Sequence, residues 1–126
     1  MKVVINIPSY KRGKNLDSFK IFKKAFYWVH QFEVDDYLEN NEGISIKVLP
    51  DSIRGNIARV RNYILEHTKE WDVSVQIDDD ISKIGMYVNR ESLSLNEEEI
   101  LLFIKKYSVL CNDFGFKLWG INVNGD

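Results

Sequence analysis

The sequence predicts an α/β protein with three layers, in which a mostly parallel sheet carries helices on both of its faces. Short apolar segments that are typical of buried strands alternate with segments in which apolar residues recur at helical spacing. The resulting order is β-α-β-α-β-(β)-α-β. This alternation is typical of parallel strands that are joined by helical crossovers.

The strands are expected to end at residues that stop or disturb a strand. Main strands are expected at residues 2–7, 44–49 and 72–77, and weaker ones at residues 82–88 and 116–123. The first is a continuous β-branched run, which indicates burial on both faces, and Pro8 follows it. Pro50 ends the second, and the third runs directly into three aspartates.

Three helices are expected between and after these strands. The apolar stripe of the first consists of Phe19, Phe22, Phe26 and Val29, and that of the second, which runs to Thr68, consists of Ile53, Ile57, Val60 and Ile64. A capping box of Ser94 and Glu97 is expected to open the third helix, and Gly115 to close it. Residues 34–43 are acidic and rich in turn formers, which predicts a surface connection.

Composition excludes several classes of protein. A length of 126 residues favours one domain spanning residues 1–126. The net charge of −2 gives no overall attraction to DNA or to an anionic membrane. The lone cysteine, Cys111, excludes a disulfide within the chain. No signal peptide or membrane span is apparent, so a soluble cytoplasmic protein is expected.

Three loops that follow strands contain most of the unusual chemistry of the chain. They are residues 8–15, 50–56 and 78–82. In an open parallel sheet the carboxyl ends of the strands lie at one edge, and ligands bind outside that edge. We therefore expect these loops to form the functional site.

Asp78, Asp79 and Asp80 form the most distinctive of these loops. On an extended backbone Asp78 and Asp80 point the same way, and their charges repel. A hard divalent cation such as Mg²⁺ or Mn²⁺ removes this repulsion and completes its coordination with water and phosphate oxygens. The position of the loop favours a metal site over the alternative, a solvated acidic turn.

Basic residues lie on the neighbouring loops. At helical spacing, Arg54 and Arg61 fall on one flank of the second helix, where a carboxylate of the acidic loop or a phosphate would pair with them. Arg59 falls on the opposite face and is expected to be solvated. Gly55 and Asn56 leave free N–H groups at the helix start. A second basic group consists of Lys11, Arg12 and Lys14. Two interpretations of this group remain open, a flexible charged loop and a contact with phosphate.

Three motifs together resemble the nucleotide-sugar half of a GT-A-fold glycosyltransferase of the family-2 class. The first is IPSYKR at residues 7–12, and the third is the Asp-x-Asp of residues 78–80. The second consists of Gly55, Ala58, Arg61 and Asn62. The resemblance covers roughly the first 85 residues, in the same order as in that class.

This resemblance implies a UDP-sugar or a similar nucleotide-sugar donor. The residues that it places at the donor nucleotide are Pro8, Ser9, Tyr10, Arg12, Asp51, Arg54, Arg61 and Asp79. The segment Pro8–Tyr10 would border the nucleoside, and Asp51 would lie near the base or ribose. Asp78 and Asp80 would hold Mn²⁺ or Mg²⁺ on the diphosphate, and Arg61 would organise the acidic loop. The replacement of the usual Asp-Asp-Gly-Ser by Pro50-Asp51-Ser52 departs from the class.

Together with IPSYKR, the segments DDDI at residues 78–81 and LWGIN at residues 118–122 also resemble phage TET-associated glycosyltransferases, which modify hydroxymethylated DNA bases. This further resemblance implies a modified DNA base as acceptor and a bacterial or phage-infected cytoplasm as the location. GT-A enzymes also carry an acceptor-binding half after the metal motif, and we expect this chain to lack it. The catalytic base is therefore unassigned, with Asp126 as the one candidate. We expect His30 and His67 to be structural or solvated helix residues.

A different class of function remains open. A non-catalytic module that binds a nucleotide or a sugar nucleotide would need the same edge of the sheet, but no catalytic base. Dependence of nucleotide binding on a metal ion, together with slow hydrolysis of the donor, distinguishes the enzyme from the module.

Overall fold

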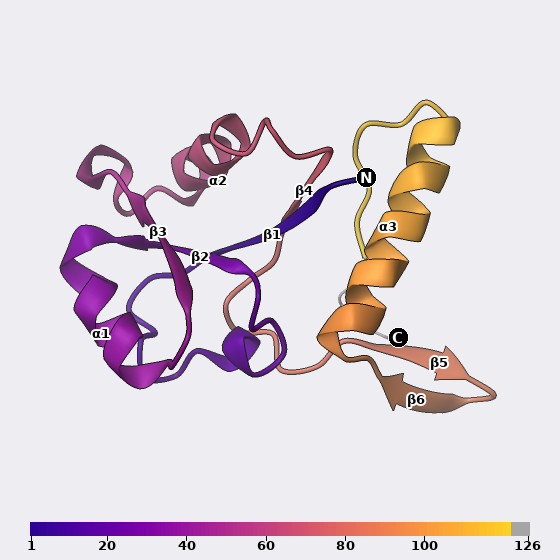
Figure 1. The fold of residues 1–126 in the computed structure, drawn as a ribbon, viewed down its shortest axis with the longest axis horizontal. Coiled ribbons are helices and arrows are strands. Elements are labelled where there is room, and N and C mark those ends of the chain that lie inside the picture. Colours follow the sequence, from indigo (N-terminus) through magenta and orange to yellow (C-terminus); the bar gives the residue numbers. More distant parts are fainter. Residues whose placement is uncertain (122–126) are drawn as a thin grey trace.

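The computed structural model describes residues 1–121 and contains a four-stranded sheet flanked by helices, with a long helix and a hairpin to one side (Figure 1). The sheet contains β1 (Val3–Pro8), β2 (Phe26–His30), β3 (Ser45–Leu49) and β4 (Val73–Gln76). The hairpin contains β5 (Gly85–Val88) and β6 (Glu91–Ser94). The α-helices are α1 (Val34–Asn40), α2 (Ile57–Glu66) and α3 (Glu97–Asp113). Short 3₁₀ helices are η1 (Asp17–Lys20), η2 (Gln31–Glu33) and η3 (Asp51–Ile53).

The sheet is parallel throughout and has the order β3-β2-β1-β4. The chain adds β2 and β3 on one side of β1, and then returns to the other side of β1 for β4. The direction of winding therefore reverses between β1 and β4. Such a reversal is the topological switch point, outside which open α/β sheets bind their ligands. The predicted α/β class with a parallel sheet is confirmed.

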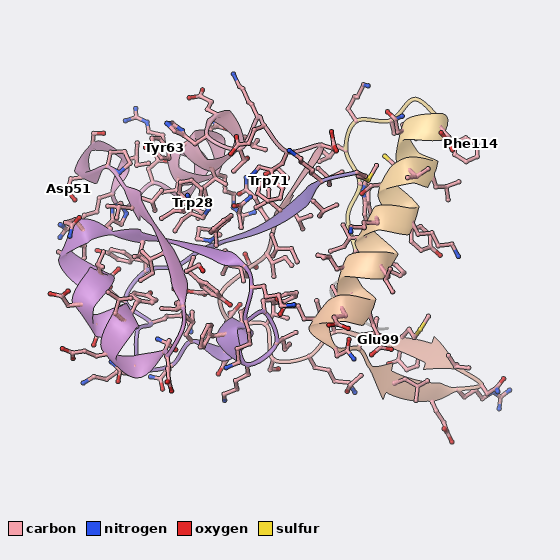
Figure 2. The ribbon with its side chains drawn as sticks, viewed as in Figure 1. Trp28, Asp51, Tyr63, Trp71, Glu99 and Phe114 are labelled. Carbon is pink, nitrogen blue, oxygen red and sulfur yellow. The ribbon has the colours of Figure 1, made fainter. Side chains whose placement is uncertain are left out.

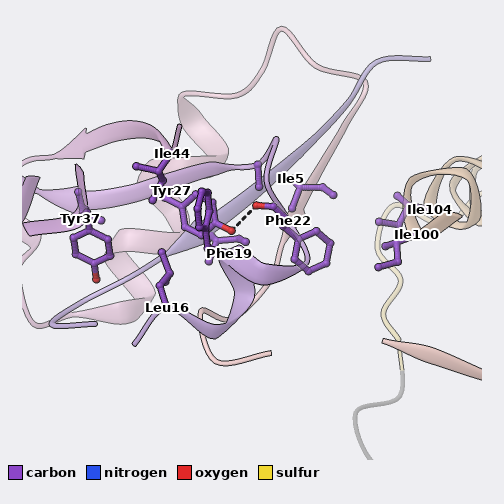
Figure 3. Packing of buried hydrophobic residues seen from close by; sticks show 12 residues of the cluster. Ile5, Leu16, Phe19, Phe22, Tyr27, Tyr37, Ile44, Ile100 and Ile104 are labelled. Atoms are coloured by element: carbon purple, nitrogen blue, oxygen red, sulfur yellow. Dashed lines mark hydrogen bonds between the residues drawn. The ribbon is translucent and has the colours of Figure 1, made fainter. Parts of the chain in front are cut away.

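Alternate residues of β2 enter two separate hydrophobic clusters. Tyr27 and Val29 enter the larger cluster, which extends from the sheet to Ile100 and Ile104 of α3 (Figure 3). Trp28 enters a smaller cluster, whose other buried members are Leu49, Val60 and Ile64. Because successive residues of a strand point to opposite faces, the two clusters separate the α3 side from the α2 side of the sheet.

A buried asparagine links the central strands. Asn6 of β1 is fully buried, and its Oδ1 accepts a hydrogen bond from Trp28 Nε1 at 2.9 Å. Its Nδ2 donates to Ser74 Oγ at 3.1 Å. These bonds satisfy the amide on the α2 side of the sheet, so a polar side chain fits a strand that is otherwise apolar on both faces.

The first helix of the sequence prediction is wrong. Phe19 lies in the short helix η1, whereas Phe26 and Val29 belong to β2. A strand that is buried on both faces loses the two-residue alternation, and its apolar residues then match helical spacing by chance. The surface connection expected at residues 34–43 is also wrong in part, because α1 forms there and is anchored by the fully buried Tyr37.

Several boundaries differ from the prediction. α2 begins at Ile57 rather than near Ile53. The capping box of α3 consists of Asn96 and Glu99, since Ser94 still pairs with Gly85 in the hairpin. The hairpin contains the expected strand β5 and a second strand, β6, that the sequence did not indicate.

The predictions for the C-terminal part of the chain are confirmed at the end of α3 but not beyond it. Gly115 follows α3 with a φ of +79°, which confirms it as the C-terminal cap. Residues 116–121 form no strand, and the last two residues of the strand expected at 116–123 lie outside the described part of the chain. Within residues 1–121, no helix is both long enough and apolar enough to cross a membrane.

Candidate functional site

Four loops meet at the carboxyl edge of the sheet. Three of them are the predicted loops after β1, β3 and β4, and the parallel direction of all strands places them at one edge. The fourth follows His30, the last residue of β2, and contains Glu33. The sequence prediction did not include this loop, because it assigned the segment before it to a helix. The order of the strands brings the β1 and β4 loops together, and places the β2 and β3 loops next to them.

A chain of hydrogen bonds joins the β1 loop to the acidic loop. The backbone N–H of Arg12 donates to Tyr37 Oη at 3.1 Å, and Tyr37 Oη lies 2.6 Å from Ser9 Oγ. Ser9 donates its only hydroxyl proton to Asp79 Oδ2 at 2.7 Å, so Tyr37 must donate to Ser9. Burial raises the pKa of Tyr37 to about 12, which keeps this phenol protonated as the chain requires.

Asp79 is therefore held by the protein itself. Its Oδ1 lies 3.4 Å from Arg12 Nε, and its Oδ2 accepts the bond from Ser9. Burial raises the pKa of Asp79, the contacts with Ser9 and Arg12 oppose that rise, and the negative charge of Asp80 adds to it. Both oxygens of Asp79 have protein partners, so this carboxylate fixes the loop, although the sequence placed it at the donor nucleotide.

The neighbouring carboxylates face solvent. β4 ends at Gln76, and Asp79 and Asp80 lie in a turn, so the extended geometry expected for Asp78 and Asp80 is wrong. The Asp78 side chain is 62% exposed, and its Oδ1 lies 2.9 Å from Arg61 Nη2. Asp80 is exposed and forms no side-chain hydrogen bond or ion pair with the rest of residues 1–121.

Ser18 of η1 fixes the backbone of the acidic loop. Its hydroxyl donates to the carbonyl oxygen of Asp78 at 2.5 Å and accepts from the N–H of Ile81 at 3.0 Å. The N–H of Ser18 also donates to the carbonyl oxygen of Asp79. The turn is thereby held in one conformation, with two of its three carboxylates directed to solvent.

The arginines separate into two groups. Arg61 of α2 contacts the acidic loop through Asp78, which confirms its expected role. Arg54 precedes α2, and its guanidinium lies 4.2 Å from the centre of the Phe32 ring, so the expected common flank with Arg61 is wrong. Arg59 is exposed, as expected, and Asn56 caps α2 by accepting a hydrogen bond from the N–H of Arg59.

Two buried polar groups at the end of β2 lack partners. His30 is 2% exposed and Glu33 is 6% exposed. His30 Nδ1 and Glu33 Oε2 are buried and form no hydrogen bond with the described residues. The other oxygen of Glu33 accepts the backbone N–H of Lys11 at 2.7 Å, and Lys11 has a φ of +56°. Burial raises the pKa of Glu33, and the nearby His30 lowers it in part.

Aromatic rings surround this pair. Tyr10 lies edge-on to His30 and Phe32, at 6.0 and 6.2 Å between ring centroids. His30 and Phe32 are stacked at 6.3 Å. Tyr10 and Phe32 are both exposed, so their rings present apolar surface at the rim of the β2 loop. The aromatic segment of residues 26–32 was the only sequence signal for this group, and a strand interpretation would have found it.

The remaining predicted residues lie apart from both groups or outside the described chain. Pro8 is buried as the last residue of β1. Asp51 is exposed at the start of η3, and Figure 2 shows it at the margin of the molecule on the β3 side. His67 is exposed and stacks on Tyr63 at 3.8 Å at the end of α2. Asp126 lies outside the described residues.

A groove elsewhere contains none of the predicted site residues. It has a volume of about 550 Å³ and lies between η1 and the end of α1. Its basic residues include Lys20, which pairs with Asp17, and Lys23, which lies over the Phe19 ring. Lys14, from the predicted basic group, also lines the groove. Two of its three lysines already have partners, so the groove is a weaker candidate site than the carboxyl edge.

Comparison with known protein families, curated proteins and solved structures gives no match for this chain. The function must therefore be argued from the site. The parallel sheet determines where a ligand would bind, and the loops at that edge determine what chemistry is available.

Proposed function

We propose that this chain is the donor-binding domain of a metal-dependent glycosyltransferase that uses a UDP-sugar or a similar nucleotide sugar. In this proposal the sheet is the centre of a three-layer GT-A fold. One observation carries the proposal. Asp78 and Asp80 stand exposed at the switch point of a parallel sheet, in a loop whose backbone is fixed by Ser18 and whose middle carboxylate is already neutralised by Arg12.

The donor set at this loop fits a hard divalent cation. Among residues 1–121, no group of three ligand side chains forms a complete metal cage. Two carboxylates without a third are typical of Mg²⁺ and Mn²⁺ sites in which phosphate and water provide the remaining ligands. Asp78 and Asp80 would hold the ion. When bound, the ion would supply Lewis-acid stabilisation of the diphosphate leaving group.

The β2 loop supports recognition of a nucleoside beside this metal site. Glu33 Oε2 and His30 Nδ1 are a buried acceptor and a ring nitrogen without partners among residues 1–121. Unpaired buried groups are costly, and a ligand with complementary polar atoms would satisfy them. The exposed Tyr10 ring stands at their rim and offers a surface for stacking. In this proposal Glu33 and His30, rather than Asp51, contact the base or ribose of the donor.

The remaining residues of the site position these groups. Arg61 holds Asp78 and screens its repulsion with Asp80. Ser9 and Tyr37 join the β1 loop to the acidic loop, so that the nucleoside and diphosphate ends of a donor would meet one rigid unit. The acceptor suggested by the sequence is a modified DNA base.

A nucleotide-binding module without transferase activity is the second candidate. The unpartnered atoms of His30 and Glu33 favour it, because these groups could bind a nucleoside without any metal. The two candidates therefore differ in how strongly nucleotide binding depends on the ion.

Titration calorimetry of the chain with UDP and UDP-glucose, with Mn²⁺ and with EDTA, tests the proposal. We expect Mn²⁺ to strengthen UDP binding by about tenfold or more, and we expect slow release of glucose from UDP-glucose. Equal affinity for UDP with Mn²⁺ and with EDTA, together with no hydrolysis of UDP-glucose, would favour the nucleotide-binding module instead. No binding of uridine, cytidine, adenosine or guanosine diphosphates in either condition would refute both candidates.

A further inference from the structure

The outward face of α3 carries exposed apolar side chains among its charged residues. Its inward face contributes Ile100 and Ile104 to the larger core cluster. At 100° per residue Leu102 points almost directly away from that core, and it is 67% exposed. Val109 lies on the same outward face and Leu110 beside it, and both are exposed.

Charged residues are arranged symmetrically about Leu102. Glu98 and Lys106 lie four residues before and after it, and Glu99 and Lys105 lie three residues before and after it. All four side chains are exposed, and none forms an ion pair within residues 1–121. Their spacing also provides no Glu–Lys pair three or four residues apart within the helix, where such pairs stabilise each other.

We propose that α3 is a docking surface for α3 of a second copy of this chain, packed antiparallel about a two-fold axis at Leu102. In this arrangement the two Leu102 side chains meet at the axis, Glu98 faces Lys106 of the other copy, and Glu99 faces Lys105. A parallel pair would instead place like charges together. Charge complementarity therefore selects both the partner and the direction.

The hairpin lies beside the N-terminal end of this surface. Figure 1 shows β5 and β6 projecting from the N-terminal end of α3, so that helix and hairpin form two arms of an angle. Met86 and Leu93 are paired across the hairpin, so they share one of its faces, and both are exposed. Met86 also lines a small cavity with Ile100 and Phe103 of α3, so this face of the hairpin is turned toward the inward side of the helix.

This geometry gives each hairpin a place in the dimer. In the antiparallel pair, Val109 and Leu110 extend past the first turn of the other α3, toward the hairpin of that copy. Their exposed side chains would lie beside the hairpin of the second copy. The inference does not rest on the proposed transferase activity, because none of these residues belongs to the carboxyl edge.

Sedimentation equilibrium of the 126-residue chain at low and high ionic strength tests the docking surface. We expect a dimer with a dissociation constant on the order of 10 μM, weakened by salt. Glu98→Lys and Lys106→Glu should each weaken dimerisation by about tenfold, since each places like charges together at two symmetric positions. The double variant Glu98→Lys/Lys106→Glu should restore the parental affinity, because it exchanges the two signs.

Matched controls separate this contact from a general effect of charge. Glu70→Lys and Lys69→Glu change the net charge by the same amounts at exposed positions outside the surface, and should leave dimerisation unchanged. Leu102→Asp should abolish the dimer while circular dichroism shows a folded chain, since Leu102 is outside the core. A monomer at all concentrations up to about 500 μM, or a dimer that is not restored in the double variant, would overturn the proposal.

Discussion

The two halves of the carboxyl edge of the sheet differ in whether their polar groups have hydrogen-bond partners. On the β1–β4 side, Ser9, Arg12 and Tyr37 form a connected chain that satisfies Asp79, and Arg61 holds Asp78. On the β2 side, His30 Nδ1 and Glu33 Oε2 are buried and lack partners among the described residues. The two halves lie on adjacent strands of one sheet, so position alone does not explain the difference.

This difference indicates what each half contributes. A satisfied network is rigid and stabilises the fold, and it holds exposed carboxylates where a ligand can reach them. An unsatisfied buried group lowers stability until a ligand provides its hydrogen bond. We therefore expect substitutions within the satisfied network of the β1–β4 side to lower stability, and substitutions on the β2 side to lower binding without lowering stability.

Asp80→Ala should have the largest effect and tests the exposed part of the β1–β4 side. The variant should lose metal-dependent UDP binding by about 100-fold or more, because it removes one of only two carboxylates available to the ion. Its thermal stability should be unchanged, since Asp80 has no partner in the described chain. Calorimetry with UDP and Mn²⁺ measures the loss, and Asp35→Ala, at an exposed position on α1, is the matched control. Parental binding by Asp80→Ala would refute the metal site.

Tyr37→Phe should lower the free energy of unfolding by about 2 kcal/mol. The variant removes the donor to Ser9 and the acceptor for the N–H of Arg12, and both groups are left in a partly buried site. Urea denaturation measures the change. Tyr107→Phe removes a hydroxyl that forms no hydrogen bond within residues 1–121, and should change stability by less than about 0.5 kcal/mol. Equal stability of the two variants would mean that the β1–β4 network is not structural.

Glu33→Gln should raise the free energy of unfolding at pH 7 by about 1 kcal/mol while weakening nucleotide binding. Burial raises the pKa of Glu33, so the folded protein retains a proton that the unfolded chain releases. The stability that this proton provides is complete below about pH 4 and is lost as pH rises through the raised pKa.

The advantage of Glu33→Gln over the parent should therefore grow as pH rises from about 4 to 7. Asp79, whose pKa is also raised, is present in both proteins and cancels from the difference. Urea denaturation at several pH values measures this trend. A Glu33→Gln variant that is less stable than the parent at pH 7 would show that Oε2, like Oε1, has a structural partner.

Arg59→Ala should have the smallest effect. Its side chain is exposed on α2 and forms no ion pair within residues 1–121, so stability and UDP binding should change by less than about 0.5 kcal/mol. Arg61→Ala is its counterpart on the same helix and should weaken metal-dependent binding, because Asp78 then lacks its partner. A large effect of Arg59→Ala would extend the site beyond the loops described.

The sequence predicted the parallel sheet and the β1–β4 side of its edge. Residues 2–7, 44–49 and 72–77 carry local signals, namely β-branched runs ended by proline or aspartate, and these signals do not depend on tertiary structure. The contact of Arg61 with the acidic loop was also predictable, because an arginine beside a buried stripe needs an anionic partner.

The β2 side was not predictable by the same reasoning. Phe26 and Trp28 face one cluster while Tyr27 and Val29 face the other, so the strand carries no alternation of apolar and polar residues. His30 was consequently placed on a helix. Which atoms lack partners depends on the packing of Lys11 and Tyr10 from another loop, and no local pattern records that.

The central position of β1 has a consequence for synthesis of the chain. β1 leaves the ribosome before the other strands of the sheet, but Val73 of β4, which pairs with Val3, follows about 70 residues later. Until then one edge of β1 has unpaired N–H and C=O groups, which can form hydrogen bonds with strands of other chains. Ile100 and Ile104, which cover the apolar side, arrive later still. Folding of the nascent protein therefore waits for β4 and α3, which are made later. A chaperone that shields β1 during synthesis should raise the yield of folded protein more than one that acts after folding.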